Sequence, residues 1–107
     1  MKEAIFHPRV IEFVRGLTRQ ARKEIGEAIR DLQKGLFVTM PSSRPMPGVA
    51  SGVHELRIKE EGKQIRIFYY LKLGDRVLIF HAFEKKTQKT PRFEIELGKK
   101  RLRELLQ

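Results

Sequence analysis

The chain has 107 residues, with 23 Lys and Arg against 13 Asp and Glu, three His and no Cys. This length suits one domain spanning residues 1–107, and the formal net charge of +10 favours a polyanionic partner, nucleic acid first. The lack of cysteine excludes a disulfide scaffold, a thiolate zinc site and a cysteine nucleophile. No apolar run approaches the roughly 18–20 residues that span a bilayer and no signal-peptide pattern opens the chain, so we expect a soluble, cytoplasmic protein without a membrane partner.

The first third of the chain predicts a short strand and two helices. Ile5-Phe6 fits the strand, and Pro8 fits the first residue of a helix that ends near Gly16. Thr18 is the expected N-cap of the second helix, which Gly35 closes. One apolar face of this helix repeats at helical spacing: Ala21, Ile25, Ala28, Ile29 and Leu32.

The rest of the chain predicts an antiparallel meander. Residues 39–52 hold three of the five prolines and are expected to be a connection that packs against other elements. Alternating polarity predicts strands over 53–59 and 64–73, and residues 76–83 are apolar on both faces, so we expect them to form the central strand. Glu60–Lys63 and Gly74-Asp75 are the expected turns.

A last helix is expected from Thr90-Pro91 onward, although its apolar residues make no clean stripe. The predicted fold class is therefore α+β: two N-terminal helices, an antiparallel sheet and a C-terminal helix.

Motifs for metal or nucleotide chemistry are absent. The three histidines, His7, His54 and His81, lie in separate segments, so a three-histidine metal site is only a remote geometric alternative. Glu60-Glu61 falls in a predicted turn and is more simply a solvated tip than an acid/base pair.

Cations converge on one face of the predicted sheet. Arg57 and Arg66 lie on adjacent antiparallel strands and are expected to be cross-strand neighbours. Lys85, Lys86 and Lys89 follow the next strand and precede a helix N-terminus, where cations and free backbone N–H groups favour phosphate. The simpler alternative is a solvated basic edge that blocks sheet-to-sheet association.

Other side chains near these cations are candidates for substrate contact. His54 and Lys59 belong to the same strand as Arg57. Phe68 and Tyr70 share the face of Arg66, where they either stack on a base or pack under the last helix; Tyr69, on the opposite face, is expected in the core.

A phosphodiester bound at such a site has a plausible cleavage route. RNA carries its own nucleophile, the 2′-hydroxyl, so cleavage needs a base, an acid and cations for the charge on the phosphorane. Crowded lysines lower one another's pKa values, which would let one of them act near neutrality. We therefore expect neither a metal ion nor another cofactor.

Three segments in order resemble the RelE/ParE superfamily of toxins from type II toxin–antitoxin systems. They are His-Glu-Leu-Arg-Ile (54–58), Arg-Ile-Phe-Tyr (66–69) and Phe-Glu-Lys-Lys-Thr-Gln-Lys-Thr-Pro (83–91), and the resemblance is greatest to the HigB-like, phage-derived branch. It implies a ribosome-dependent mRNA endonuclease (mRNA interferase) that inhibits translation without a metal. It also implies an antitoxin partner, often a helix-turn-helix protein like HigA.

The resemblance assigns roles by position. Arg57 matches a strand cation that contacts the phosphate or acts as base, Arg66 matches an arginine that stabilises the transition state, and Lys85, Lys86 and Lys89 match the catalytic basic segment. Two departures stand out. Arg92-Phe93 replaces the catalytic tyrosine of RelE, so protonation of the leaving group falls to a lysine, to a histidine such as His54, or to no residue. Glu55 is acidic where RelE is basic, and pairing with Arg57 or a neighbouring lysine is the simpler account. Two other functions remain open, a ParE-like inhibitor of DNA gyrase and a plain nucleic-acid-binding domain.

Overall fold

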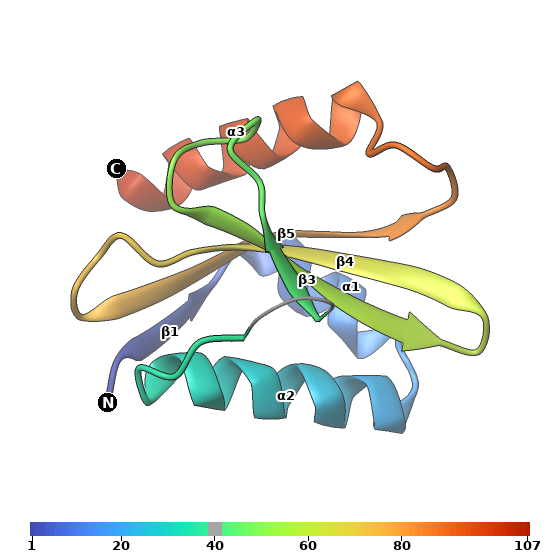
Figure 1. The fold of residues 1–107 in the computed structure, drawn as a ribbon, viewed down its shortest axis with the longest axis horizontal. Helices are drawn as coiled ribbons and strands as arrows, with labels where there is room; N and C mark the ends of the chain where they lie inside the picture. Colours follow the sequence, from blue (N-terminus) through green and yellow to red (C-terminus); the bar gives the residue numbers. More distant parts are fainter. Residues whose placement is uncertain (39–41) are drawn as a thin grey trace.

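The computed structural model of the protein describes residues 1–38 and 42–107. Its elements run in the order β1 (Glu3–Phe6), α1 (Pro8–Arg15), α2 (Arg19–Gln33), β2 (Ser43–Pro45), β3 (Val53–Glu60), β4 (Lys63–Tyr70), β5 (Arg76–Lys85) and α3 (Arg92–Leu106). The five strands form one sheet with α2 on one face and α3 on the other (Figure 1). The predicted α+β class is confirmed at this level.

The sheet is mixed rather than purely antiparallel. The strand order is β1-β5-β4-β3-β2, and β1 pairs with β5 in parallel while the other pairs are antiparallel. The short N-terminal strand thereby covers one edge of β5, and the middle strand of the sheet is β4. The prediction that residues 76–83 form the central strand is therefore wrong in position, although β5 is an interior strand. The predicted meander corresponds to β3, β4 and β5.

Both N-terminal helices begin where their sequences predict. His7 caps α1 through its Nδ1 atom, which accepts the backbone N–H of Arg9 at 3.1 Å, and Pro8 occupies the first turn. Thr18 caps α2, and Gly35 follows that helix with a φ of 84°, as expected of its closing glycine.

The β3–β4 hairpin supplies a second cap to α2. The side chain of Glu60 is buried and accepts a hydrogen bond from the backbone N–H of Thr18, which lowers the pKa of Glu60. In a capping box a glutamate three residues into the helix makes this contact, but Ala21 occupies that position here. The prediction of a solvated tip is wrong for Glu60, because it joins the hairpin to the helix. The turn itself uses Glu61 and Gly62, both with positive φ, as a two-residue hairpin requires.

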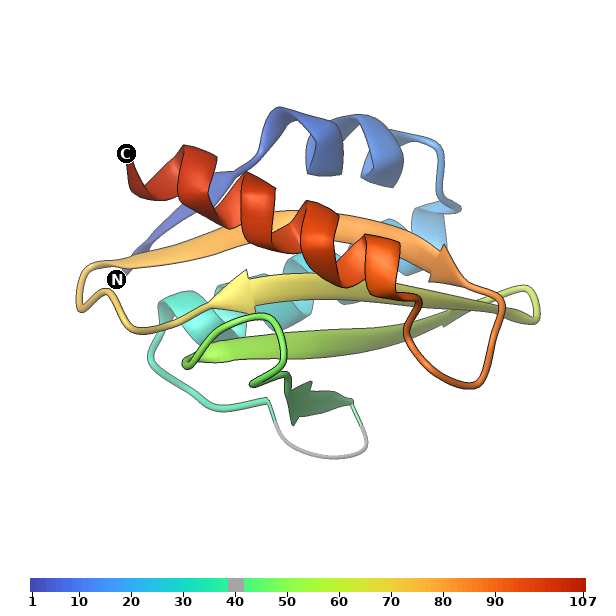
Figure 2. The same ribbon diagram turned by 90° about the horizontal axis from the view of Figure 1, so that it is seen from above.

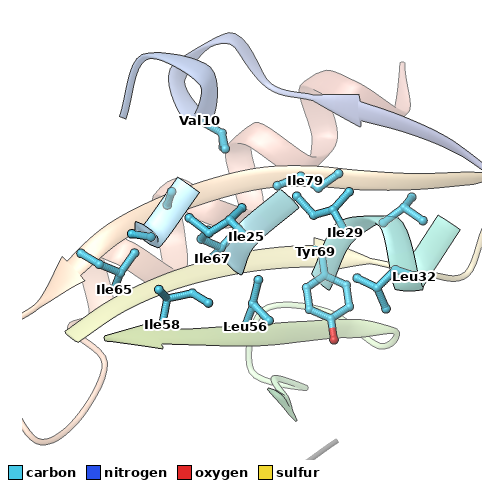
Figure 3. Close-up of a cluster of buried hydrophobic side chains, with 13 residues drawn as sticks. Val10, Ile25, Ile29, Leu32, Leu56, Ile58, Ile65, Ile67, Tyr69 and Ile79 are labelled. Atoms are coloured by element: carbon cyan, nitrogen blue, oxygen red, sulfur yellow. The ribbon is translucent and has the colours of Figure 1, made fainter. Parts of the chain in front are cut away.

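An aliphatic core lies between the sheet and the two N-terminal helices (Figure 3). The predicted apolar face of α2 packs there against the side of β4 that carries Ile65, Ile67 and Tyr69. The expectation that Tyr69 is a core residue is confirmed, and its hydroxyl reaches the buried Ser43 hydroxyl of β2. Part of the predicted connection 39–52 thus packs as expected; residues 39–41 lie outside the described residues.

Helix α3 packs on the opposite face of the sheet through a stripe that contains a glycine. Ile95, Gly98, Leu102 and Leu105 lie at helical spacing, and Gly98 and Leu102 are buried. A Cβ atom at Gly98 would lie 3.0 Å from Cδ2 of Phe68, so this glycine permits the close approach of helix and strand. The missing side chain also explains why the sequence shows no clean apolar stripe. Among the described residues, no helix is long and apolar enough to cross a membrane.

Candidate functional site

Four cations and one carboxylate gather on the α3-facing side of the sheet, where the strands extend beyond the start of that helix. The strand register places Arg57 of β3 opposite Arg66 of β4, and Lys85 of β5 opposite Gln64, the next residue of β4 on the same face. β2 pairs with the other edge of β3, and there Arg44 lies opposite Glu55. We call this group the cationic cluster: Arg44, Glu55, Arg57, Arg66 and Lys85.

Glu55 is fully buried within the cationic cluster, at 1% exposure. Its Oε1 atom lies 3.5 Å from Nε of Arg57 and 3.7 Å from Nε of Arg66. These are ion-pair distances that exceed hydrogen-bonding distance. Within the described part of the chain, Oε2 of Glu55 and both Nε atoms are buried without a hydrogen-bond partner.

The two arginines differ in exposure. The Arg66 side chain is 8% exposed and donates from Nη1 to the Ile65 carbonyl at 3.1 Å and from Nη2 to Oε1 of Gln64 at 3.2 Å. Burial lowers its pKa, Glu55 opposes this effect, and Arg57 and Arg44 add to it. The Arg57 side chain is 26% exposed. Arg57 is therefore the more accessible of the pair, and Arg66 belongs to the floor of the site.

Lys85 is the one lysine of the cluster, and its pKa is also lowered. Burial is the main cause that lowers its pKa; Glu55 opposes it, while Arg66, Arg57 and Arg44 lower the pKa further. The sequence predicts a lysine of lowered pKa here, but it attributes the effect to neighbouring lysines. The structure assigns it to burial and to arginines on three other positions of the sheet.

Lys86 and Lys89 lie outside the cluster, in the exposed loop between β5 and α3. The loop includes a hydrogen bond from Oγ1 of Thr87 to the Lys89 carbonyl at 2.6 Å. This loop and the β3–β4 turn lie at the same end of the molecule (Figures 1 and 2). The three predicted lysines therefore separate into one half-buried side chain and two solvated ones.

A surface hollow of about 390 Å³ adjoins the cluster on the β3–β4 hairpin. Arg57 and Lys59 line it from β3, and Gln64 and Arg66 line it from β4. Glu24 of α2, Ser42 and Ile58 complete the lining, so three cations and one carboxylate share the wall. Lys59 lies where the sequence places it, on the exposed face beside Arg57.

The remaining predicted contacts divide between the two faces of the sheet. His54 lies on the opposite face from Arg57 and stacks on Tyr69 with ring centroids 5.5 Å apart, so the sheet separates it from the cluster. Phe68 is fully buried against Phe80 and Phe83, and it packs under α3 instead of offering a ring for stacking. Tyr70 is half-buried and packs against the apolar cluster that contains Phe68, Phe80 and Phe83.

A second polar cluster, missed from the sequence, lies under α3. His81 is 1% exposed; its Nε2 lies 2.8 Å from Oε1 of Glu94, and its Nδ1 lies 2.8 Å from Nη1 of Arg101. Since a guanidinium only donates, Nδ1 accepts and Nε2 carries the proton that it donates to Glu94. Burial, with Arg101 and His7 adding to it, lowers the pKa of His81 to about 4. The sequence did not indicate this contact, because His81 lies on a strand and its partners Glu94 and Arg101 lie on a separate helix.

Arg44 is the other residue that the sequence analysis missed. It lies on a three-residue edge strand inside the proline-rich segment 39–52, and its cross-strand partner is visible only from the register. The one available indication was the length of that connection. In residues 1–38 and 42–107, no group of three or more His, Cys, Asp or Glu side chains is placed to hold a metal ion.

The fold and this site describe a small α+β protein with a basic cluster on an open sheet face. A family model matches residues 12–103, and it is that of the phage-derived Gp49-like proteins (DUF891). The chain belongs to this family, which is associated with RelE-like toxins. A search of curated proteins found no significant match.

Proposed function

We propose that this protein is the toxin of a type II toxin–antitoxin module and that it cuts mRNA on the ribosome. The family supports the toxin assignment at the coarse level. The observation that carries the nuclease assignment is the presence on one sheet face of Lys85, whose pKa is lowered by burial and by arginines, and of the accessible Arg57, with β4 between them. A cation that can lose its proton beside one that stays charged provides base and charge stabiliser together.

The proposed reaction is an internal transesterification of RNA. The neutral amine of Lys85 accepts the proton of the 2′-hydroxyl, and the 2′-oxygen forms a bond to phosphorus. Arg57 and Arg44 stabilise the added negative charge of the phosphorane. The bond from phosphorus to the 5′-oxygen breaks, and that oxygen takes a proton from the loop lysines, Lys86 or Lys89, or from water. The products are a 2′,3′-cyclic phosphate and a 5′-hydroxyl end.

Arg66 has a supporting role in this proposal. It is 6% exposed and both of its Nη atoms donate within β4, so it contributes positive potential from the floor rather than direct contact. The proposed partners are the ribosome with its mRNA, in the cytoplasm, and an antitoxin. The charge of +10 attracts ribosomal RNA, and a partner of opposite charge would associate rapidly.

The test is expression in a bacterium with primer extension on one translated message. Wild type should arrest growth and produce new 5′ ends in phase with codons. Lys85→Ala and Arg57→Ala should each reduce cleavage by about 100-fold, because each removes one acid–base or charge-stabilising group. Lys23→Ala is the matched control, since this exposed α2 lysine lies on the other side of the sheet, and it should cleave like wild type.

Other outcomes would identify the two alternative functions. Growth arrest without new 5′ ends, accompanied by inhibition of purified DNA gyrase, would replace the nuclease with a ParE-like toxin. RNA binding that weakens steeply with salt and never leads to cleavage would indicate a plain nucleic-acid-binding domain.

A further inference from the structure

Glu55 is an unusual residue at the centre of a basic surface. It is the only acidic member of the cationic cluster, and its own negative charge repels a phosphate. It is also 1% exposed and therefore too enclosed to contact a substrate itself. Its place in the molecule requires another explanation.

Stability alone does not provide that explanation. A buried carboxylate stabilises a fold when hydrogen bonds satisfy its oxygens, and it is costly when they do not. Among the described residues, Oε2 of Glu55 is buried without a partner, and Oε1 lies 3.5 and 3.7 Å from the two arginine Nε atoms. Phe68 faces Glu55 across the β3–β4 pair, so an apolar residue at this position would have an apolar partner.

The geometry does explain how two arginines are tolerated face to face. Arg57 and Arg66 are directly opposed across the β3–β4 pair, an arrangement in which like charges repel. Glu55 lies two residues before Arg57 on β3 and diagonal to Arg66, so one carboxylate oxygen serves both guanidinium groups. Because each is approached at Nε, the Nη groups of the more exposed Arg57 stay available to an anion.

We propose that Glu55 is a positioning residue: it holds Arg57 and Arg66 side by side across the β3–β4 pair. Glu55 is also the one carboxylate in the cluster, so its charge opposes the combined effect of burial and three arginines on the pKa of Lys85. The link to cleavage rests on the proposed function; the two structural effects do not.

The first test measures the pKa of Lys85 by NMR titration of its side-chain resonances. Glu55→Gln keeps the shape of the side chain and removes its charge, so the pKa should fall by about 0.5–1 unit. Glu84→Gln is the matched control: it changes the net charge equally, but Glu84 precedes Lys85 on β5 and faces the other side of the sheet. Equal pKa values in wild type and Glu55→Gln, or equal shifts in the two variants, would overturn the inference.

The second test begins with the wild-type protein and therefore covers the event that Glu55→Gln fails to fold. Hydrogen exchange at the Nε–H groups of wild-type Arg57 and Arg66 should be slower than at the exposed Arg103. In Glu55→Asp, which withdraws the carboxylate by one methylene, exchange at Arg57 should accelerate while Arg103 is unchanged. Exchange at Arg57 as fast as at Arg103 in the wild-type protein would contradict the positioning role.

The third test connects the inference to cleavage. If neutral Lys85 is the base, the rising limb of the cleavage rate against pH should move to lower pH in Glu55→Gln by the amount of the NMR shift. An NMR shift without a kinetic shift would refute Lys85 as base and leave the role of Glu55 intact. If the pH profile of cleavage moves in Glu84→Gln and not in Glu55→Gln, the result would count against Glu55.

Discussion

Under α3, His81 makes two contacts of 2.8 Å and both of its ring nitrogens have partners. On the same face of the sheet, Glu55 of β3 makes two contacts of 3.5 and 3.7 Å, and one of its oxygens has none within the described residues. The first cluster is closed by a helix and the second is open to solvent at Arg57. We infer from this difference that the closed cluster attaches α3 to the sheet, whereas the open cluster is accessible to a ligand.

The largest expected effect comes from breaking the closed cluster. His81→Ala leaves a cavity and removes the partner of both Glu94 and Arg101, so the free energy of unfolding should fall by about 3 kcal/mol. Urea denaturation of the purified protein measures this loss. A decrease below about 1 kcal/mol would mean that His81 contributes no more than an ordinary exposed residue.

Acid should open the same cluster without a substitution. The pKa of His81 is about 4 in the folded protein against an ordinary 6.5. Between pH 4 and pH 6.5 the unfolded chain therefore binds a proton at His81 that the folded chain does not bind. Stability from His81 is present above pH 6.5 and declines as the pH falls towards 4, by up to about 3 kcal/mol. The raised pKa of Glu94 acts in the opposite direction near pH 4.5 and above, and offsets part of this decline. Denaturation at pH 7, 5.5 and 4.5 should show the decline in wild type and a smaller one in His81→Gln.

The open cluster should respond in activity rather than in stability. Arg44 is exposed on the edge strand and faces Glu55, so Arg44→Ala should reduce cleavage by about tenfold and leave the thermal midpoint within about 2 °C of wild type. Arg30→Ala, which removes an exposed cation from α2, serves as control. Equal losses in both variants would indicate a general field effect and not membership of a site.

The smallest expected effects are changes in stability of opposite sign at two helical glycines, Gly98 and Gly26. In Gly98→Ala the new methyl group meets the buried ring of Phe68 at 3.0 Å, and the protein should lose about 1 kcal/mol of stability in spite of the better helix former. In Gly26→Ala of α2, where no described atom beyond the adjoining residues and the backbone of the helix itself lies within 4 Å of the new Cβ, stability should rise by about 0.5–1 kcal/mol. Thermal melts of both variants check the signs, and stabilisation by Gly98→Ala would show that the α3 contact is loose.

The sequence predicts those features that depend on local chemistry. Thr18, Gly35 and the period of the α2 face are local signals that locate this helix and its ends, and alternation places Arg57 and Arg66 on one face of adjacent strands. Features that depend on contacts between distant segments were missed. The parallel pairing of β1, the capping of α2 by Glu60 and the contact of His81 with α3 each join elements whose sequences carry no mark of the partner.

The candidate site shows the same limit. Alternation located the two arginines, but it left Phe68 between stacking on a base and packing under the last helix, because period two cannot tell which part of a face a helix will cover. Proximity in sequence grouped three lysines that the end of β5 separates into one half-buried and two exposed side chains.

The pairing of β1 with β5 has a consequence for how the chain folds as it is synthesised. Glu3 pairs with Arg76 and Phe6 with Ile79, so the first strand of the chain waits for its neighbour until most of the polypeptide exists. Such distant pairing slows folding, because a long loop must close before the contact forms. β5 also supplies Lys85 to the cationic cluster, so the cluster is complete only once that strand has left the ribosome and joined the sheet.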